Sequence, residues 1–278
     1  MAKIKRNMPL ARADLESLLR TRHLDRTLTS ALPATDGDEQ SIAPTGISSL
    51  DASLGGGFPR GQLSELVGSR SSGRMSVLLA MAAAATARGE LVALVDGLDM
   101  LDVESAVAAG VDLDRLLWIR GHVVTNPGFC RDMNQRAMDQ VVKALTLVLQ
   151  AGNFGLVAFD VGEAPVEALR RLPFTTWLRL QRMVEGSQTV CVLVGRDPMA
   201  RSSAGLTVQV GRTVRTPGEK SVGGQRNGER SGIRFGSRLY EGLDVEVRVI
   251  RARARGFEHQ AAAFSTAPSH CDDERMIR

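Results

Sequence analysis

Residues 63–88 read LSELVGSRSSGRMSVLLAMAAAATAR. The segment 63–67 is short and bounded by glycines, which predicts a buried strand, whereas residues 77–88 form a longer apolar and alanine-rich run, which predicts a helix. Between them lies a loop of small and basic residues with a glycine at each end. This stretch therefore predicts a strand, a tight turn and a helix in direct succession.

The rest of the chain repeats this alternation of strand and helix. Further strands are predicted at residues 91–95, 116–119, 156–159 (ending in Asp160), 189–194 and 243–250. Helices are predicted at residues 103–109, 126–150 and 174–185, with Asn126 and Pro127 beginning the second of these and Gly152 ending it. Such alternation is typical of an α/β fold with a doubly wound, mostly parallel sheet.

Composition limits the class of protein. With 43% hydrophobic residues among 278, the chain can bury a core, and its formal charge of +4 permits nucleic acid as a partner without requiring it. Aromatic residues make up only 4%, which argues against base stacking as the main mode of nucleic-acid binding. Cys130, Cys191 and Cys271 lie far apart and the four histidines are scattered. We therefore expect neither a metal site nor a disulfide framework.

The sequence gives no reason to expect a membrane protein. Its longest apolar run, residues 77–87, is too short to span a bilayer, and no apolar segment follows the basic N-terminus. We therefore expect a cytoplasmic protein without a signal peptide.

Four regions are expected along the chain. Residues 1–28 carry a short amphipathic helix with Leu15, Leu18 and Leu19 on one face, which packs on its own domain or docks on a neighbouring molecule. Residues 29–41 form a polar linker, residues 42–265 the core and residues 266–278 a frayed tail. Within the core, residues 211–238 hold seven glycines and seven Lys or Arg against two Glu, which predicts a flexible basic insertion.

The loop between the first strand and helix resembles a phosphate-binding loop. That motif is G-x-x-x-x-G-K-[S/T] between a strand and a helix, and Gly68 and Gly73 have its spacing. The small Ser71 and Ser72 allow backbone N–H groups to form an anion nest at the start of the helix.

Two chemically active positions of this loop are altered. Arg74 stands where a phosphate-gripping Lys belongs, and Met75 stands where a hydroxyl would coordinate Mg²⁺. A guanidinium is bulkier and planar, and a thioether is not a ligand for a hard cation. Either the loop is kept for packing, or it still binds a nucleotide or another anion.

Several blocks of the sequence resemble the RecA recombinase family. Residues 45–57 (TGISSLDASLGGG) and 59–63 (PRGQL) resemble the family's approach to the phosphate loop, and residues 110–117 (GVDLDRLL) resemble a second block. The strand ending in Asp160 resembles the Walker B strand, and residues 245–264 resemble the last core strands. Since these blocks agree in order over residues 42–265, the resemblance implies a RecA-like core.

The resemblance also assigns roles to single positions. The family's catalytic Glu falls at Leu98, the Tyr that stacks on adenine at Ser105, and the Gln that senses the γ-phosphate at Arg196. Asp96 and Asp99 do not fit the register of the catalytic Glu. The Walker B Asp survives as Asp160, and two Lys that reach a neighbour's nucleotide fall near Arg251 and Arg253, which keep their charge. The resemblance therefore implies no catalytic residue and inefficient ATP hydrolysis.

This pattern of losses is most similar to the RecA-like accessory proteins of translesion-synthesis operons, the ImuA type. The loops after Asp160 and after residue 194 look short, and we expect the family's separate C-terminal domain to be absent. The resemblance implies a DNA-repair accessory protein that binds RecA, a translesion polymerase complex or both, with self-association as a further possibility and no certain cofactor.

Two groups of arginines are candidates for partner or DNA binding. The basic insertion contributes Arg212, Arg215, Arg226, Arg230, Arg234 and Arg238, which can bind phosphate backbones or only add solubility. Arg251 and Arg253 belong to a subunit interface or to an exposed strand face. Three interpretations therefore stand: an accessory interaction protein, a non-specific single-stranded DNA-binding module, and a weak DNA-dependent ATPase.

Overall fold

The computed structural model describes residues 42–214, 243–252 and 261–266. The predicted N-terminal helix with Leu15, Leu18 and Leu19, the linker 29–41 and residues 267–278 of the predicted tail lie outside the described residues, whereas Thr266, the first residue of that tail, is the last residue of a strand. So do Arg215, Arg226, Arg230, Arg234, Arg238 and Arg253.

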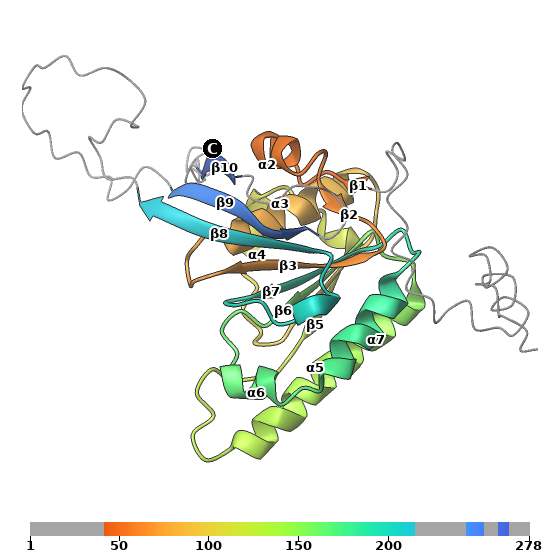
Figure 1. Ribbon diagram of the computed structural model, residues 1–278, viewed down its shortest axis with the longest axis vertical. Coiled ribbons are helices and arrows are strands. Elements are labelled where there is room, and N and C mark those ends of the chain that lie inside the picture. The colour runs from red at the N-terminus through yellow and green to blue at the C-terminus, as the bar shows by residue number, and fades with distance from the viewer. Residues whose placement is uncertain (1–41, 215–242, 253–260, 267–278) are drawn as a thin grey trace, which may run out of the picture. The chain divides into compact units, whose positions relative to one another are not determined.

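The described core is built on one large, mostly parallel sheet of order β10-β9-β8-β3-β7-β6-β4-β5 (Figure 1). Its strands are β3 (Gln62–Gly68), β4 (Val92–Asp96), β5 (Leu116–Arg120), β6 (Leu156–Asp160), β7 (Val190–Gly195), β8 (Leu206–Val214), β9 (Leu243–Ala252) and β10 (Ala261–Thr266). Every pairing from β8 to β5 is parallel, whereas β9 and β10 are added antiparallel. The predicted α/β fold class is confirmed.

Helices cover both faces of this sheet (Figure 1). One face carries α2 (Ser48–Ser53), α3 (Arg74–Ala87) and α4 (Val103–Ala108), and the other α5 (Arg131–Ala151), α6 (Val166–Arg170) and α7 (Phe174–Val184). Alternate strand residues feed the two cores: in β6, Leu156 and Ala158 join the first, and Val157 and Phe159 the second. This is why the central strands read as continuous apolar runs.

The remaining described elements are small. The strands β1 (Ile42–Ala43) and β2 (Phe58–Pro59) form a separate antiparallel pair, and two 3₁₀ turns lie at Leu113–Arg115 and Arg201–Ser203. In the described part of the chain, no helix is both long and apolar enough to cross a bilayer.

The prediction that Asn126 and Pro127 begin the helix expected at residues 126–150 was wrong. Helix α5 begins at Arg131, and the residues before it form a loop in which Gly128 has a φ of 52° and the Cys130 N–H donates to the Pro127 carbonyl. The Asn134 side chain accepts from Val124 N at 2.8 Å and thereby fastens this loop to the helix. The predicted stop at Gly152 is confirmed by its left-handed backbone, with a φ of 73°.

The basic insertion was predicted to begin too early. Residues 211–214 continue β8, because they pair with β9 as far as Val214 opposite Leu243. Arg212 is therefore a strand residue. The predicted alternation in β9 is confirmed, since Val245, Val247 and Val249 are buried.

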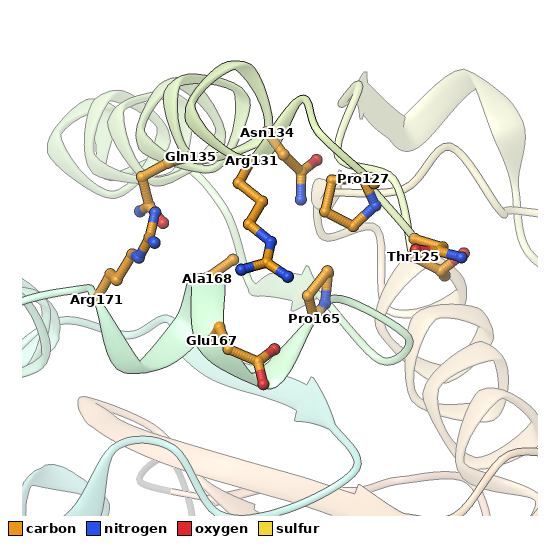
Figure 2. A pocket seen from close by; sticks show the side chains of 11 residues that line it. Thr125, Pro127, Arg131, Asn134, Gln135, Pro165, Glu167, Ala168 and Arg171 are labelled. Carbon is orange, nitrogen blue, oxygen red and sulfur yellow. The ribbon is translucent and has the colours of Figure 1, made fainter.

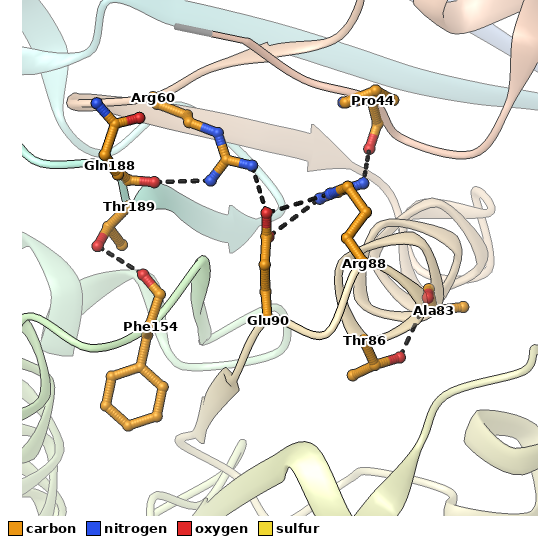
Figure 3. A network of polar contacts seen from close by, with 9 residues as sticks. All are labelled: Pro44, Arg60, Ala83, Thr86, Arg88, Glu90, Phe154, Gln188 and Thr189. Carbon is orange, nitrogen blue, oxygen red and sulfur yellow. Dashed lines mark hydrogen bonds and ion pairs between the residues drawn. The ribbon is translucent and has the colours of Figure 1, made fainter. Parts of the chain in front are cut away.

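An ion-pair network lies where the central strands begin (Figure 3). Glu90 accepts from Arg60 at 2.6 Å and from two nitrogens of Arg88 at 3.1 and 3.2 Å, while Arg60 also donates to the Gln188 carbonyl at 2.7 Å. Burial alone would raise the pKa of Glu90, but these hydrogen bonds outweigh it and lower the pKa. The network joins the starts of β3 and β4 to the loop before β7. It therefore lies at the amino ends of these strands, whereas the phosphate loop follows the carboxyl end of β3.

Candidate phosphate-loop site

The phosphate loop joins the end of β3 to the start of α3. The backbone geometry and close packing at its two predicted glycines explain why glycine is required there. Gly73 has a φ of 98°, and a Cβ there would lie 2.8 Å from Val245 of β9. A Cβ at Gly68 would lie 2.5 Å from both Ser72 Oγ and the Val210 carbonyl. Both positions therefore exclude a side chain, whether or not the loop binds a ligand.

The loop backbone has the features of an anion nest. Helix α3 has 14 residues, and no side chain caps its N-terminus. Ser72 is fully buried, and its Oγ has no hydrogen-bond partner among the described residues. Free N–H groups in the first turn and an unpartnered hydroxyl together suit a phosphate or another oxyanion.

The Arg74 side chain is not free to grip such a ligand. Its Nη1 donates to the Gly68 carbonyl at 2.5 Å, and its Nη2 pairs with Glu163 Oε1 at 2.7 Å. The Arg74 and Glu163 side chains are only 10% and 22% exposed. A Cβ at Gly162 would collide with the guanidinium, so Arg74 packs directly on that glycine. Arg74 thus ties the phosphate loop to the loop after β6.

Asp160 lies at the end of β6, in the same pocket as Arg74. The pKa of Asp160 is raised to about 6, mainly by burial and to a smaller extent by nearby Asp96 and Glu163, although the Gly162 N–H, which donates at 2.8 Å, and the charge of Arg74 lower it. The pocket measures about 260 Å³ and also contains Arg70, Ser71, Ser72, Leu98 and Glu163. The structure therefore brings the predicted loop residues and Asp160 together.

Asp96 shapes the turn that carries Leu98. Its buried carboxylate accepts from the backbone of Leu98, Met100 and Leu101 and from Trp118 Nε1, at 2.8 to 3.3 Å. With these donors in place, Asp96 is engaged in holding the turn and is not positioned as a base for an attacking water.

Asp99, the other carboxylate of this turn, is also engaged. Arg120 donates to both of its oxygens, at 2.6 and 2.8 Å, and this bidentate contact lowers the pKa of Asp99. Leu98 itself packs against the second core. The position that the resemblance gives to the catalytic Glu therefore has no acidic substitute in this turn.

The loop does not fit magnesium in the way it fits an anion. Met75 is half-buried against the first core and offers only a thioether. Among the described residues, no group of three or more His, Cys, Asp or Glu side chains is arranged to hold a metal ion.

Other candidate residues lie away from this pocket. Ser105 is exposed on α4, where its hydroxyl donates to Asp102 at 2.5 Å. Arg196 is exposed just after β7 and lines two neighbouring pockets, one of which also contains Gly68 and Ser69. Arg251 is exposed on β9 and donates to the Arg201 carbonyl.

The sequence interpretation missed several residues around the site. Glu163 lies three positions after Asp160, and this closeness in sequence was the available signal that it belongs to the same site. Glu65, fully buried in β3, accepts from Met199 N and Ala200 N, both at 2.7 Å, and thereby anchors the loop after β7. A hollow of about 300 Å³ between α5 and α6 was also missed; Arg131, Glu167 and Arg171 line it (Figure 2).

Comparison with known proteins agrees with this geometry. Residues 28–125 match the family model described as the RecA N-terminal domain. Protein RecA of Heliobacterium modesticaldum is 30% identical over 230 residues, which are 77% of this chain and 57% of the relative. Protein RecA of Salinispora tropica is 30% identical over 222 residues, which are 78% of this chain and 60% of the relative.

A third relative matches a shorter part. Protein RecA of Acholeplasma laidlawii is 35% identical over 134 residues, which are 47% of this chain and 36% of the relative. The chain thus spans between about a third and three fifths of the length of these curated relatives. The family match, the relatives and the mostly parallel sheet together support a RecA-like family for this chain.

Proposed function

We propose that this chain is a RecA-like accessory protein of DNA repair, of the ImuA type, which acts in the cytoplasm during damage-induced, SOS-type translesion mutagenesis. It binds RecA, a translesion polymerase complex or both, without efficient ATP turnover. The observation that carries the proposal is the pairing of Arg74 with Glu163 at 2.7 Å in a phosphate loop whose backbone is kept.

The lost side chains support a role without hydrolysis. Leu98 cannot polarise a water molecule, Met75 cannot coordinate Mg²⁺, and Arg74 is engaged within the protein. The loss of one electrostatic stabiliser costs an enzyme about 10²- to 10³-fold in rate, so the combination leaves little turnover.

The preserved architecture supports binding to a RecA-like partner or to a second copy of this chain. The core keeps its sheet and its two helical layers, and Arg251 stands exposed on β9. In this proposal Arg251, together with Arg253 and the N-terminal residues Leu15, Leu18 and Leu19, contacts the partner.

Co-sedimentation with RecA filaments on single-stranded DNA tests the proposal, with naked DNA as the control. The chain is expected to pellet with filaments and not with DNA. Arg251→Glu is expected to weaken the binding, whereas Arg248→Glu, the same charge change three residues along the strand, serves as the matched control. DNA-stimulated phosphate release by the unmodified chain would contradict the proposal.

Single-stranded DNA binding is the second candidate. A pocket of about 270 Å³ between the loops after β6 and β7 contains the partly exposed Phe174 beside Arg170, Arg196 and Arg201, and the Arg201 guanidinium lies 6.0 Å from the Phe174 ring. Cations beside aromatic rings suit a nucleic-acid strand. Pelleting with naked DNA, weakened steeply between about 50 and about 200 mM salt, would favour this candidate.

A further inference from the structure

The Arg74–Glu163 pair occupies the position from which the loop would hold a phosphate. A guanidinium pairs with a carboxylate and with a phosphate through the same planar arrangement of N–H donors. Here that capacity is divided between Glu163 Oε1 and the Gly68 carbonyl, at 2.7 and 2.5 Å. We propose that Glu163 is a built-in competitor for phosphate, so that the pocket stays closed to phosphate-bearing ligands until the Arg74–Glu163 pair opens.

The charges around the pocket support this closure. Arg70 and Arg74 contribute two cations, whereas Asp96, Asp160 and Glu163 contribute three carboxylates. A polyphosphate that entered would meet these carboxylates in a partly buried space, where like charges repel strongly. Removal of the Glu163 charge both reduces this repulsion and releases Arg74.

The cradle itself is already formed, so opening the pair needs no rebuilding of the loop. The packing of Gly73 against Val245 fixes the backbone before α3. The Ser72 hydroxyl is buried without a hydrogen-bond partner among the described residues, and no side chain caps the first turn of α3. Both features indicate that an oxyanion fits here. What closes the site is therefore one side-chain contact between two loops.

The test is calorimetric titration of the whole chain with inorganic tripolyphosphate in magnesium-free buffer. Glu163→Gln is expected to bind tripolyphosphate roughly ten-fold more tightly than the unmodified chain, because it loses a like charge and frees Arg74. Glu167→Gln, the same charge change at an exposed position of α6, is the matched control and is expected to change affinity by less than about two-fold.

A second variant opens the pair by shape instead of charge. Gly162→Ala places a Cβ against the guanidinium, which must leave Glu163, and a smaller gain in the same direction is expected. This variant keeps the proposal testable if Glu163→Gln fails to fold, which a thermal melt of each protein reveals.

Combination with Arg74→Ala shows whether the gain passes through the arginine. The gain of Glu163→Gln is expected to disappear in the double variant. Equal affinities of Glu163→Gln and the unmodified chain, including no measurable binding by either, overturn the proposal, as does a gain that survives Arg74→Ala. The probe is an inorganic anion, so a failure to bind RecA filaments would not affect this outcome.

Discussion

Asp160 shows what a single buried carboxylate contributes to this site. Burial raises its pKa to about 6 from an ordinary value of 3.8, so the folded protein holds a proton on Asp160 more tightly than the unfolded chain does. Between these two pH values, the free energy of unfolding therefore increases as the pH falls. At neutral pH the ionised form destabilises the fold.

Asp160→Asn is expected to raise the free energy of unfolding at pH 8 by about 1–3 kcal/mol, and to make little difference near pH 4. The Asn carbonyl can still accept from the Gly162 N–H. Urea denaturation at both pH values measures the effect, with the exposed Asp139→Asn as control. A variant less stable than the unmodified chain at pH 8 would show that the carboxylate is stabilising.

Arg74→Lys combined with Met75→Thr rebuilds the sequence of a working phosphate loop. No DNA-stimulated ATP hydrolysis is expected from this double variant, because Leu98 still supplies no base and Glu163 still faces position 74. A phosphate-release assay with and without single-stranded DNA measures the rate. Turnover clearly above background would contradict the expectation that Leu98 and Glu163 prevent hydrolysis.

At the residue scale, the sequence predicts those features that depend on neighbours in the chain. Gly68 and Gly73 could be predicted from their spacing, and their packing against Val210 and Val245 explains them. Glu163 could not be predicted as the partner of Arg74, because the two lie 89 residues apart and meet only through the order of β3 and β6 in the sheet.

At the scale of elements, the Glu90 network joins central strands at their amino ends, away from the phosphate loop (Figure 3). Glu90→Gln is expected to cost about 1–2 kcal/mol of unfolding free energy at pH 7, after allowance for the partial exposure of these side chains. Because folding lowers the pKa of Glu90 below its ordinary value of 4.5, the ionised side chain contributes to the free energy of unfolding above about pH 4.5. This contribution is lost as the pH falls below that value and Glu90 becomes protonated.

Urea denaturation at pH 7 and near pH 4 tests this dependence. The difference between Glu90→Gln and the unmodified chain is expected to shrink at the lower pH. Glu185→Gln, at an exposed position after α7, is the control and is expected to change stability by less than about 0.5 kcal/mol. A pH-independent cost would assign the effect to packing.

Apolar periodicity explains which elements could be predicted. The central strands and β9 follow from apolar runs and alternation, and each is found close to its predicted residues. Strand β8 was missed because its end runs into glycine-rich sequence, although Leu206, Val208 and Val210 alternate along it; its pairing with β3 on one side and β9 on the other defines it. The start of α5 was misplaced because the tertiary contacts of Asn134 hold residues 125–130 as a loop.

At the scale of the whole molecule, β8 ends directly opposite the start of β9, with Val214 paired to Leu243. A two-residue Asn-Gly turn can therefore replace residues 215–242 without changing the register of the hairpin. The shortened chain is expected to melt within about 3 °C of the full chain, and to keep its binding to RecA filaments.

The same replacement tests the DNA-binding role of the basic insertion. If Arg215, Arg226, Arg230, Arg234 and Arg238 bind the phosphate backbone, anisotropy titration with a labelled single strand will show a loss of affinity and of salt dependence. Unchanged, salt-sensitive binding would instead assign that role to arginines of the described core, such as Arg170 and Arg201.

The turn held by Asp96 has a consequence for protein design. One buried carboxylate orders the backbone from Leu98 to Leu101, and the side chain at position 98 takes no part in those hydrogen bonds. An acidic residue can therefore be introduced at position 98 without loss of these hydrogen bonds, although the packing of Leu98 against the second core is given up. The chain offers a scaffold on which catalytic groups are added one at a time, so that the worth of each can be measured as a gain.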